Sequence, residues 1–213
     1  REGWCAVVAL ITMALYGAGL VFFDHRWGLL GLIGAVFSVL TVFTTSMIYT
    51  QLKTIPRWNS PLTPVMFLSY SFSAGALLTG QEPWAIILLL IAGTTQIALW
   101  AQGDGALASS GTTLATATGL GPRGDVRAFE PPHTGTNYLL KEFAFTVGRK
   151  HSQKMRIISI VLMAGVPILL LLPPFSHFLA AVAVASHIAG ALASRWLFFA
   201  EAEHVVGLYY GKR

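Results

Sequence analysis

Long runs of uncharged, mostly apolar residues alternate with short polar segments along the whole chain. Crossing the hydrocarbon layer of a bilayer takes about 20 apolar residues, and most of the runs have roughly that length. Each run is expected to be a helix, because in lipid every backbone polar group must be satisfied within its own segment. The pattern therefore predicts six membrane spans, at 4–23, 28–50, 62–80, 83–101, 157–173 and 175–200.

The composition supports an all-α integral membrane protein. Hydrophobic residues make up 54% of the 213 residues, charged residues only 11%, and the mean hydropathy is +0.65. Soluble domains carry about 25% charged residues, so this chain has too few charges to cover a surface that faces water. Membrane lipids are the expected surroundings, and no nucleic-acid partner is expected.

The connections between the runs differ in charge from one side to the other. Of the fourteen Lys and Arg residues, twelve lie on the side that holds both termini and the long 102–156 segment. One, Arg26, lies in the short turns of the other side, and Arg195 lies within the last run. The excess of positive charge predicts that the first side is cytoplasmic. The spans and the long loop divide the chain into three parts: 1–101 with four spans, the cytoplasmic loop 102–156, and 157–213 with two spans and a tail.

The 102–156 loop is expected to dock a partner protein. Its first half is rich in Gly, Ser, Thr and Ala, which favours irregular structure. Its second half, 137–156, has apolar residues at helical spacing with charges elsewhere on the wheel, which predicts an amphipathic helix at the membrane surface. Loops of this length are usually functional or disordered, and the aromatic residues here favour function.

Three segments carry a resemblance to a known family. The stretch IYTQLKTIPRWNSPLTPVMFL at 48–68, and the last span with Arg195 and the His204 region after it, resemble the membrane anchors of dimethyl sulfoxide reductase-type molybdoenzymes. The loop FEPPHTGTNYLLKEFAFTVGRKH at 129–151 is similar to the branch linked with cytoplasmic, quinone-linked sulfite dehydrogenases. The resemblance covers nearly the whole chain.

The resemblance implies a three-subunit complex in a bacterial inner membrane. A molybdopterin subunit performs the substrate chemistry, a four-cluster iron–sulfur subunit with [4Fe-4S] clusters carries electrons, and the anchor provides a quinone site. Cys5 is the only cysteine, so this chain cannot itself ligate such clusters. Family anchors have eight spans. The Arg1 start resembles the entrance to the third, so two spans and a quinol-site histidine are expected to precede it.

The expected quinone site lies at the cytoplasmic end of the spans, near the iron–sulfur partner. Glu2 matches a carboxylate that the family uses for quinol binding and proton transfer, and Tyr49 is placed to hydrogen-bond a quinone oxygen. The full set of quinone-site candidates is Glu2, Tyr49, Arg57, Trp58 and Trp100. Tyr and Trp at span ends also serve as plain interface anchors, and Lys and Arg there as plain topology charges, so both roles stay open.

Further side chains are assigned to proton transfer and to partner docking. Glu2, Arg195 and His204 are candidates for a proton path, and Arg195 is expected to find its partner on another helix rather than at Glu201 or Glu203. The docking candidates are Lys53, His133, Tyr138, Lys141, Arg149 and Lys150.

Three alternatives to a quinone-reactive anchor stay open. His187, in the middle of the last span, can serve as a haem b ligand. A second histidine ligand would have to come from a facing span, and His25 and His177 both lie near the side of the short turns. A purely structural anchor would need no quinone. A small-solute transporter would call for broken helices or internal repeats, and the sequence shows neither.

Overall fold

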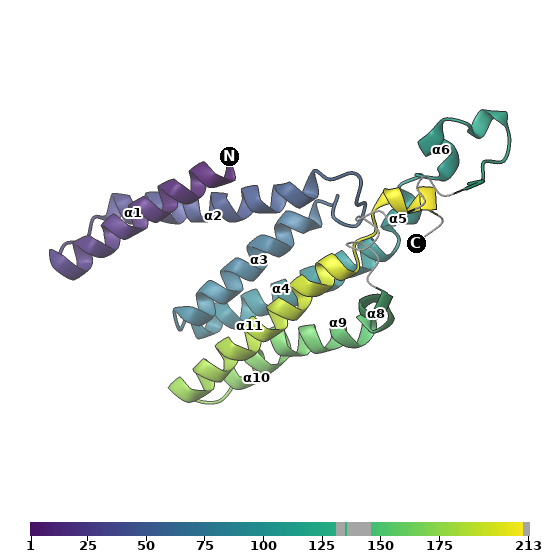
Figure 1. Cartoon of the computed structure of the whole chain (residues 1–213). Coiled ribbons are helices and arrows are strands. Elements are labelled where there is room, and N and C mark those ends of the chain that lie inside the picture. The colour runs from purple at the N-terminus through teal and green to yellow at the C-terminus, as the bar shows by residue number, and fades with distance from the viewer. Residues whose placement is uncertain (131–134, 136–145, 211–213) are drawn as a thin grey trace.

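The structure is a computed structural model of the whole chain, and it describes residues 1–130, 135 and 146–210 (Figure 1). Helices joined by turns and irregular loops make up these residues. The long helices are α1 (Glu2–Phe22), α2 (Gly28–Thr50), α3 (Leu62–Leu78), α4 (Glu82–Asp104), α9 (Ser152–Ile160) continued by α10 (Val166–Leu171), and α11 (His177–Ala200). The short ones are α5 (Ala106–Ser109), α6 (Leu114–Thr118), η1 (Gly121–Arg123), α8 (Thr146–Lys150), η2 (Val161–Gly165) and η3 (Val205–Tyr210).

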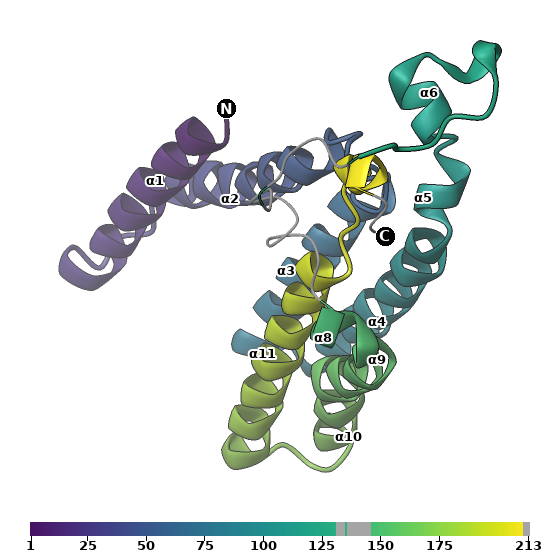
Figure 2. The same ribbon diagram turned by 45° about the vertical axis from the view of Figure 1, so that its right-hand side comes forward.

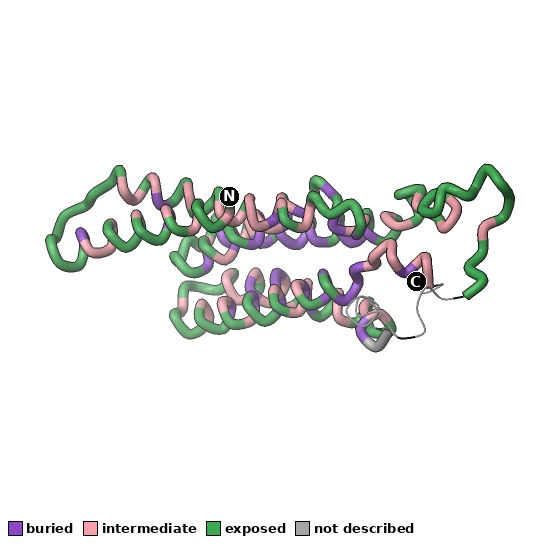
Figure 3. The backbone as a smooth tube through the Cα atoms, turned by 45° about the horizontal axis from the view of Figure 1, so that its top comes forward, coloured by how far each residue is buried: buried purple, intermediate pink, exposed green. Residues whose placement is uncertain are grey.

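The core of the molecule lies between α3, α4, the α9–α10 segment and α11, which form a helical bundle (Figures 1 and 2). Met66, Leu89 and Met163 are almost fully buried there. Figure 3 shows the buried residues gathered on the facing sides of these helices. The outward sides stay apolar and exposed, as expected of helices whose surroundings are lipid.

The α1–α2 hairpin packs on itself and is joined to the bundle through the C-terminal end of α2 (Figure 2). Small residues let its two helices approach closely: a Cβ on Gly34 would lie 2.6 Å from Met13 Sδ. Most of the hairpin is exposed or only partly buried (Figure 3). Large apolar side chains such as Leu10, Phe22 and Leu32 are among its exposed residues. Such a surface belongs in the hydrocarbon layer or against other spans.

All six predicted spans are helical in the structure. Among the described residues, five helical segments are long and apolar enough to cross a membrane: α1, α2, α4, the continuous 152–171 segment and α11. The third predicted span is the shorter helix α3, with 17 residues, which ends at Leu78. The fifth begins at Ser152, five residues before the predicted start, so its first turns carry Lys154 and Arg156. The chain is therefore a multi-pass membrane protein.

Only part of the long loop can be compared with the prediction of an amphipathic helix over 137–156. Residues 136–145 lie outside the described residues. From Thr146 onward the chain is helical, first as α8 and then, after a break at His151, as α9. The stretch just before the fifth span is thus helical, with a break at His151, and the amphipathic helix over 137–156 stays a prediction.

Candidate functional site

An aromatic cage lies at the end of the bundle that holds the C-terminal ends of α2 and α11. Its members are Tyr49 on α2, Trp58 in the loop after it, Phe67 on α3, and Phe198 and Phe199 on α11. The Trp58 ring stacks on Phe198 with centroids 5.0 Å apart, and its indole N–H donates to the Phe198 carbonyl at 2.9 Å. Tyr49 meets both of these rings edge-on, each at 5.2 Å. Three helices and one loop are thus joined through their rings.

The loop after α2 is held in place by its own polar side chains. Asn59 donates to the Thr50 carbonyl, and the Ser60 hydroxyl donates to the Gln102 side chain on α4. Thr63, in the first turn of α3, donates to the Trp58 carbonyl at 2.8 Å. These bonds fold the loop back over the bundle, which is why Trp58 is buried although it lies between two helices.

Arg195 projects into the cage. Its guanidinium carbon lies 4.5 Å from the centroid of Phe67, 4.7 Å from that of Phe198, and 5.3 Å from that of Tyr49. These distances are within the range of cation–π attraction. The expectation that Arg195 finds a partner on another helix is met in part: Tyr49 on α2 and Phe67 on α3 lie across from it, while Phe198 belongs to its own helix. One of its terminal nitrogens, Nη1, is buried and has no hydrogen-bond partner.

Glu2 opens α1 at the same end of the molecule. Its carboxylate accepts a hydrogen bond from the Thr45 hydroxyl on α2 at 2.7 Å. Thr45 is one helical turn before Tyr49, so the two residues lie on the same side of α2. The structure therefore puts Glu2 beside the helix that carries the cage tyrosine, and Thr45 holds its carboxylate there.

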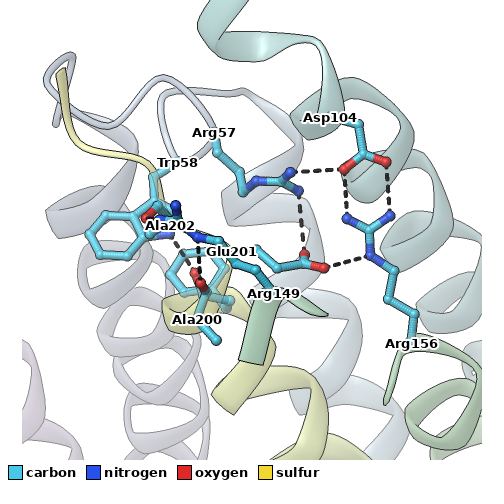
Figure 4. A network of polar contacts seen from close by, with 9 residues as sticks. Arg57, Trp58, Asp104, Arg149, Arg156, Ala200, Glu201 and Ala202 are labelled. Atoms are coloured by element: carbon cyan, nitrogen blue, oxygen red, sulfur yellow. Dashed lines mark hydrogen bonds and ion pairs between the residues drawn. The ribbon is translucent and has the colours of Figure 1, made fainter. Parts of the chain in front are cut away.

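An ion-pair cluster ties four segments together beside the cage (Figure 4). Its members are Arg57, Asp104, Arg156 and Glu201, which come from the loop after α2 and from α4, α9 and the end of α11. Glu201 is 5% exposed and pairs with Arg156 at 2.7 Å and with Arg57 at 3.4 Å. Asp104 is 47% exposed and pairs with the same two arginines at 2.6 and 2.8 Å. Each arginine thus bridges two carboxylates.

Two predicted quinone-site residues belong to this cluster or touch it. Arg57 is one of its members, and Trp100 lies under Arg156 with 5.3 Å between guanidinium carbon and ring centroid. Gly103 faces Arg57 so closely that a Cβ there would lie 2.7 Å from Nη1. Arg57 and Trp100 line a small cavity together with Gln96 and Phe198. Its volume, about 10 Å³ for the centre of a water molecule, has roughly the room for one water and far less than a quinone head group needs.

The C-terminal end of α11 is capped by α8 and by the tail. Arg149 donates to the Ala200 and Ala202 carbonyls at 3.3 and 2.9 Å, which satisfies acceptors that a helix end leaves open. In the tail, His204 Nδ1 accepts from the Val206 amide at 3.0 Å. Burial lowers the pKa of the His204 imidazole, so this predicted proton-path residue favours its neutral form.

The predicted docking residues have different surroundings. Lys53 and Lys150 are exposed and available to a partner. Arg149 is only partly exposed and makes the helix-capping contacts above. His133, Tyr138 and Lys141 lie outside the described residues, so their docking role stays a prediction.

His187 has a structural contact that bears on the haem prediction. The fifth span contains a π-helical turn at Val161–Gly165, followed by Pro167. Proline has no N–H, so Pro167 cannot donate to the Met163 carbonyl four residues before it. His187 Nδ1 lies 2.7 Å from that carbonyl and must donate to it, since a carbonyl only accepts. This bond explains a buried histidine without haem. The haem role stays a prediction, because Nδ1–H bonded to a carbonyl is also how ligating histidines are oriented.

Sequence reasoning missed the two acids of the cluster and the phenylalanines of the cage. Asp104 and Glu201 are the acids that follow the fourth and sixth apolar runs, on the same side as Arg57 and Arg156. Opposite charges at successive helix ends on one side are a signal that could have indicated pairing. Phe67, Phe198 and Phe199 gave no such signal, because the spans are apolar on all sides.

The long apolar helices define a multi-pass membrane protein, and its ion-pair cluster lies at one end of the bundle. The chain belongs to the DMSO reductase anchor subunit (DmsC) family, whose family model matches residues 6–211. It is 29% identical over 198 residues to a sulfite dehydrogenase subunit of Allochromatium vinosum, over 85% of this chain and 60% of that relative. The chain thus spans about 60% of the length of this curated relative. No solved structure matches it.

Proposed function

We propose that this chain holds an iron–sulfur subunit and a molybdopterin subunit at the membrane and passes electrons between the iron–sulfur subunit and the quinone pool. Membership of the anchor-subunit family supports the anchoring role. The name of the curated relative, a sulfite dehydrogenase subunit, supports sulfite as the substrate of the molybdopterin subunit. In that reaction sulfite and water give sulfate, two protons and two electrons, and a quinone takes up two electrons and two protons to become quinol.

The observation that carries the quinone role is the aromatic cage. A quinone head group needs aromatic walls and hydrogen-bond donors for its oxygens, close to the face on which the electron donor docks. The cage combines Tyr49 and Trp58, two of the predicted quinone-site residues, with three phenylalanine rings and a buried arginine N–H. It lies at the end of the bundle that also carries the exposed Lys53 and Lys150. A purely structural anchor has no need of this combination.

The test uses the intact complex, solubilised and purified through a tag on this chain. We expect a molybdenum and iron–sulfur protein to copurify, and sulfite to reduce both a short-chain quinone and a soluble dye. Without this chain, the soluble subunits are expected to reduce the dye but not the quinone. Quinone reduction at an unchanged rate without the chain would contradict the quinone role and leave only a structural anchor. A chain that purifies without any partner would contradict the proposed complex.

The sidedness of the chain is a separate prediction. Both termini and the 102–156 loop are expected to face the cytoplasm, because twelve of the fourteen Lys and Arg residues lie on that side. Ser110, exposed in this loop, is replaced by cysteine in a Cys5→Ser background. A membrane-impermeant thiol reagent should label it in inverted vesicles and not in intact cells. Ser176, in the turn before α11, replaced in the same way, is the matched control and should show the opposite pattern; labelling of position 110 from outside would reverse the topology.

A further inference from the structure

Arg195 is the charged residue of the described spans whose partners are rings and not acids. Its guanidinium is attracted to the faces of four rings, those of Tyr49, Phe67, Phe198 and Phe199, at 4.5 to 5.3 Å. Ring faces interact with the charge, but they do not replace an in-plane oxygen acceptor for the guanidinium N–H groups. The Nη1 nitrogen is buried and lacks such an acceptor. A buried N–H of a charged group without a partner is costly, so the position calls for an oxygen.

The neighbouring carboxylates are engaged elsewhere. Glu201, six residues after Arg195, is held by Arg57 and Arg156. Glu2 accepts a hydrogen bond from Thr45 within the α1–α2 hairpin. The ring walls around Arg195 favour an oxygen carried by a flat, apolar molecule, which is the chemistry of a quinone head group.

We propose that Arg195 binds the quinone directly, with Nη1–H donating to a quinone oxygen and the guanidinium charge stabilising the negative charge that reduction places there. The proposal rests on the quinone role proposed above and deepens it by naming the cation of the site. Arginine stays charged in proteins, so it cannot supply the proton. Arg195 is therefore a binding residue of the cage, in place of the proton-path role that its position in the last span predicts.

The test measures binding as well as turnover, on the intact complex in membranes. The probe is a fluorescent hydroxyquinoline N-oxide, a quinone analogue with an anionic oxygen, titrated against wild type, Arg195→Gln and Arg195→Lys. Glutamine removes the charge and is expected to weaken analogue binding about 100-fold, and lysine, which keeps the charge but loses the planar fork, about 10-fold. The KM for quinone should rise with the same ranking, and the sulfite-to-dye rate should not change.

Arg26→Gln is the matched control, because Arg26 is exposed in the turn at the far end of the α1–α2 hairpin. It should bind the analogue like wild type. Wild-type affinity in the Arg195→Lys complex overturns the proposal, whether or not the glutamine variant assembles. The proposed function survives that result, because the wild-type complex still binds the analogue and reduces quinone. A wild-type complex that neither binds the analogue nor reduces quinone instead removes the proposed function.

Discussion

Replacing Glu2 with glutamine is expected to lower the sulfite-to-quinone rate by about 10²–10⁴, the usual loss for a positioned acid or base. The sulfite-to-dye rate and the assembly of the complex should not change. Glutamine keeps an oxygen that can accept from the Thr45 hydroxyl, now 2.7 Å from the carboxylate, so the local geometry is retained. What glutamine cannot do is take up or release the proton that accompanies quinone reduction.

A structural role for Glu2 makes a different prediction. An acidic residue in the first turn of a helix interacts with the helix dipole, a contribution of about 0.3–1 kcal/mol. In that case Glu2→Gln loses a little stability and keeps its full quinone-linked rate. Glu82 offers a matched control, because it too is an acid in the first turn of a span, α4, at the opposite end of the bundle. Glu82→Gln should leave both rates intact, and a fully active Glu2→Gln complex would remove Glu2 from the site.

The spans could be predicted because lipid imposes a single requirement, a run of apolar residues long enough to cross it. That requirement is strong enough to find even α3, whose 17 residues are the fewest of the six. It is weaker at the ends. Lys154 and Arg156 are charged and so lay outside the predicted fifth span, yet they occupy its first turns, where long side chains reach the surface or a partner.

The cage could be predicted only in part. Tyr49 at the end of the second predicted span, and Trp58 beside Arg57 in the polar loop after it, stand out, so a functional interpretation of this stretch followed from the sequence. Arg195 stood out as a charge within a span. Which rings surround it depends on how α2, α3 and α11 pack, and helices that are apolar on all sides give no periodic signal for their contact faces. The pairing therefore became visible only with the fold.

The ion-pair cluster shows a second limit. The positive-inside rule uses Lys and Arg and gives little weight to Asp and Glu. Arg156 therefore counted only as a topology charge, and Arg57 as a topology charge or a quinone-site residue. In the structure both are largely buried against Glu201 and Asp104. The same two arginines therefore contribute to the membrane topology and to the ion pairs of the bundle end. Counting charges along the sequence does not separate these roles.

Glu201→Gln is expected to be clearly more destabilising than the loss of either neighbouring acid, Asp104 or Glu203. Glu201 is 5% exposed, and its two arginine partners have side chains only 14% and 11% exposed. Removing one partner from a buried ion pair typically costs about 3–5 kcal/mol, because the remaining charge stays buried. Since Asp104 continues to contact both arginines, we expect about 3 kcal/mol, the low end of that range. The midpoint of heat-induced aggregation of the detergent-solubilised complex should fall clearly below that of wild type.

Two neighbouring acids make the test specific. Asp104 contacts the same arginines but is 47% exposed, so Asp104→Asn should cost about 1 kcal/mol or less, as solvent screens the lost charge. Glu203 lies two residues after Glu201 outside the cluster, and Glu203→Gln should change the midpoint little. The expected order of destabilisation is thus Glu201, then Asp104, then Glu203. Equal midpoints for the Glu201 and Glu203 variants would mean that the cluster does not stabilise the bundle end. In that case the four segments that it joins must be held by the apolar packing of the bundle, the aromatic cage and the loop hydrogen bonds.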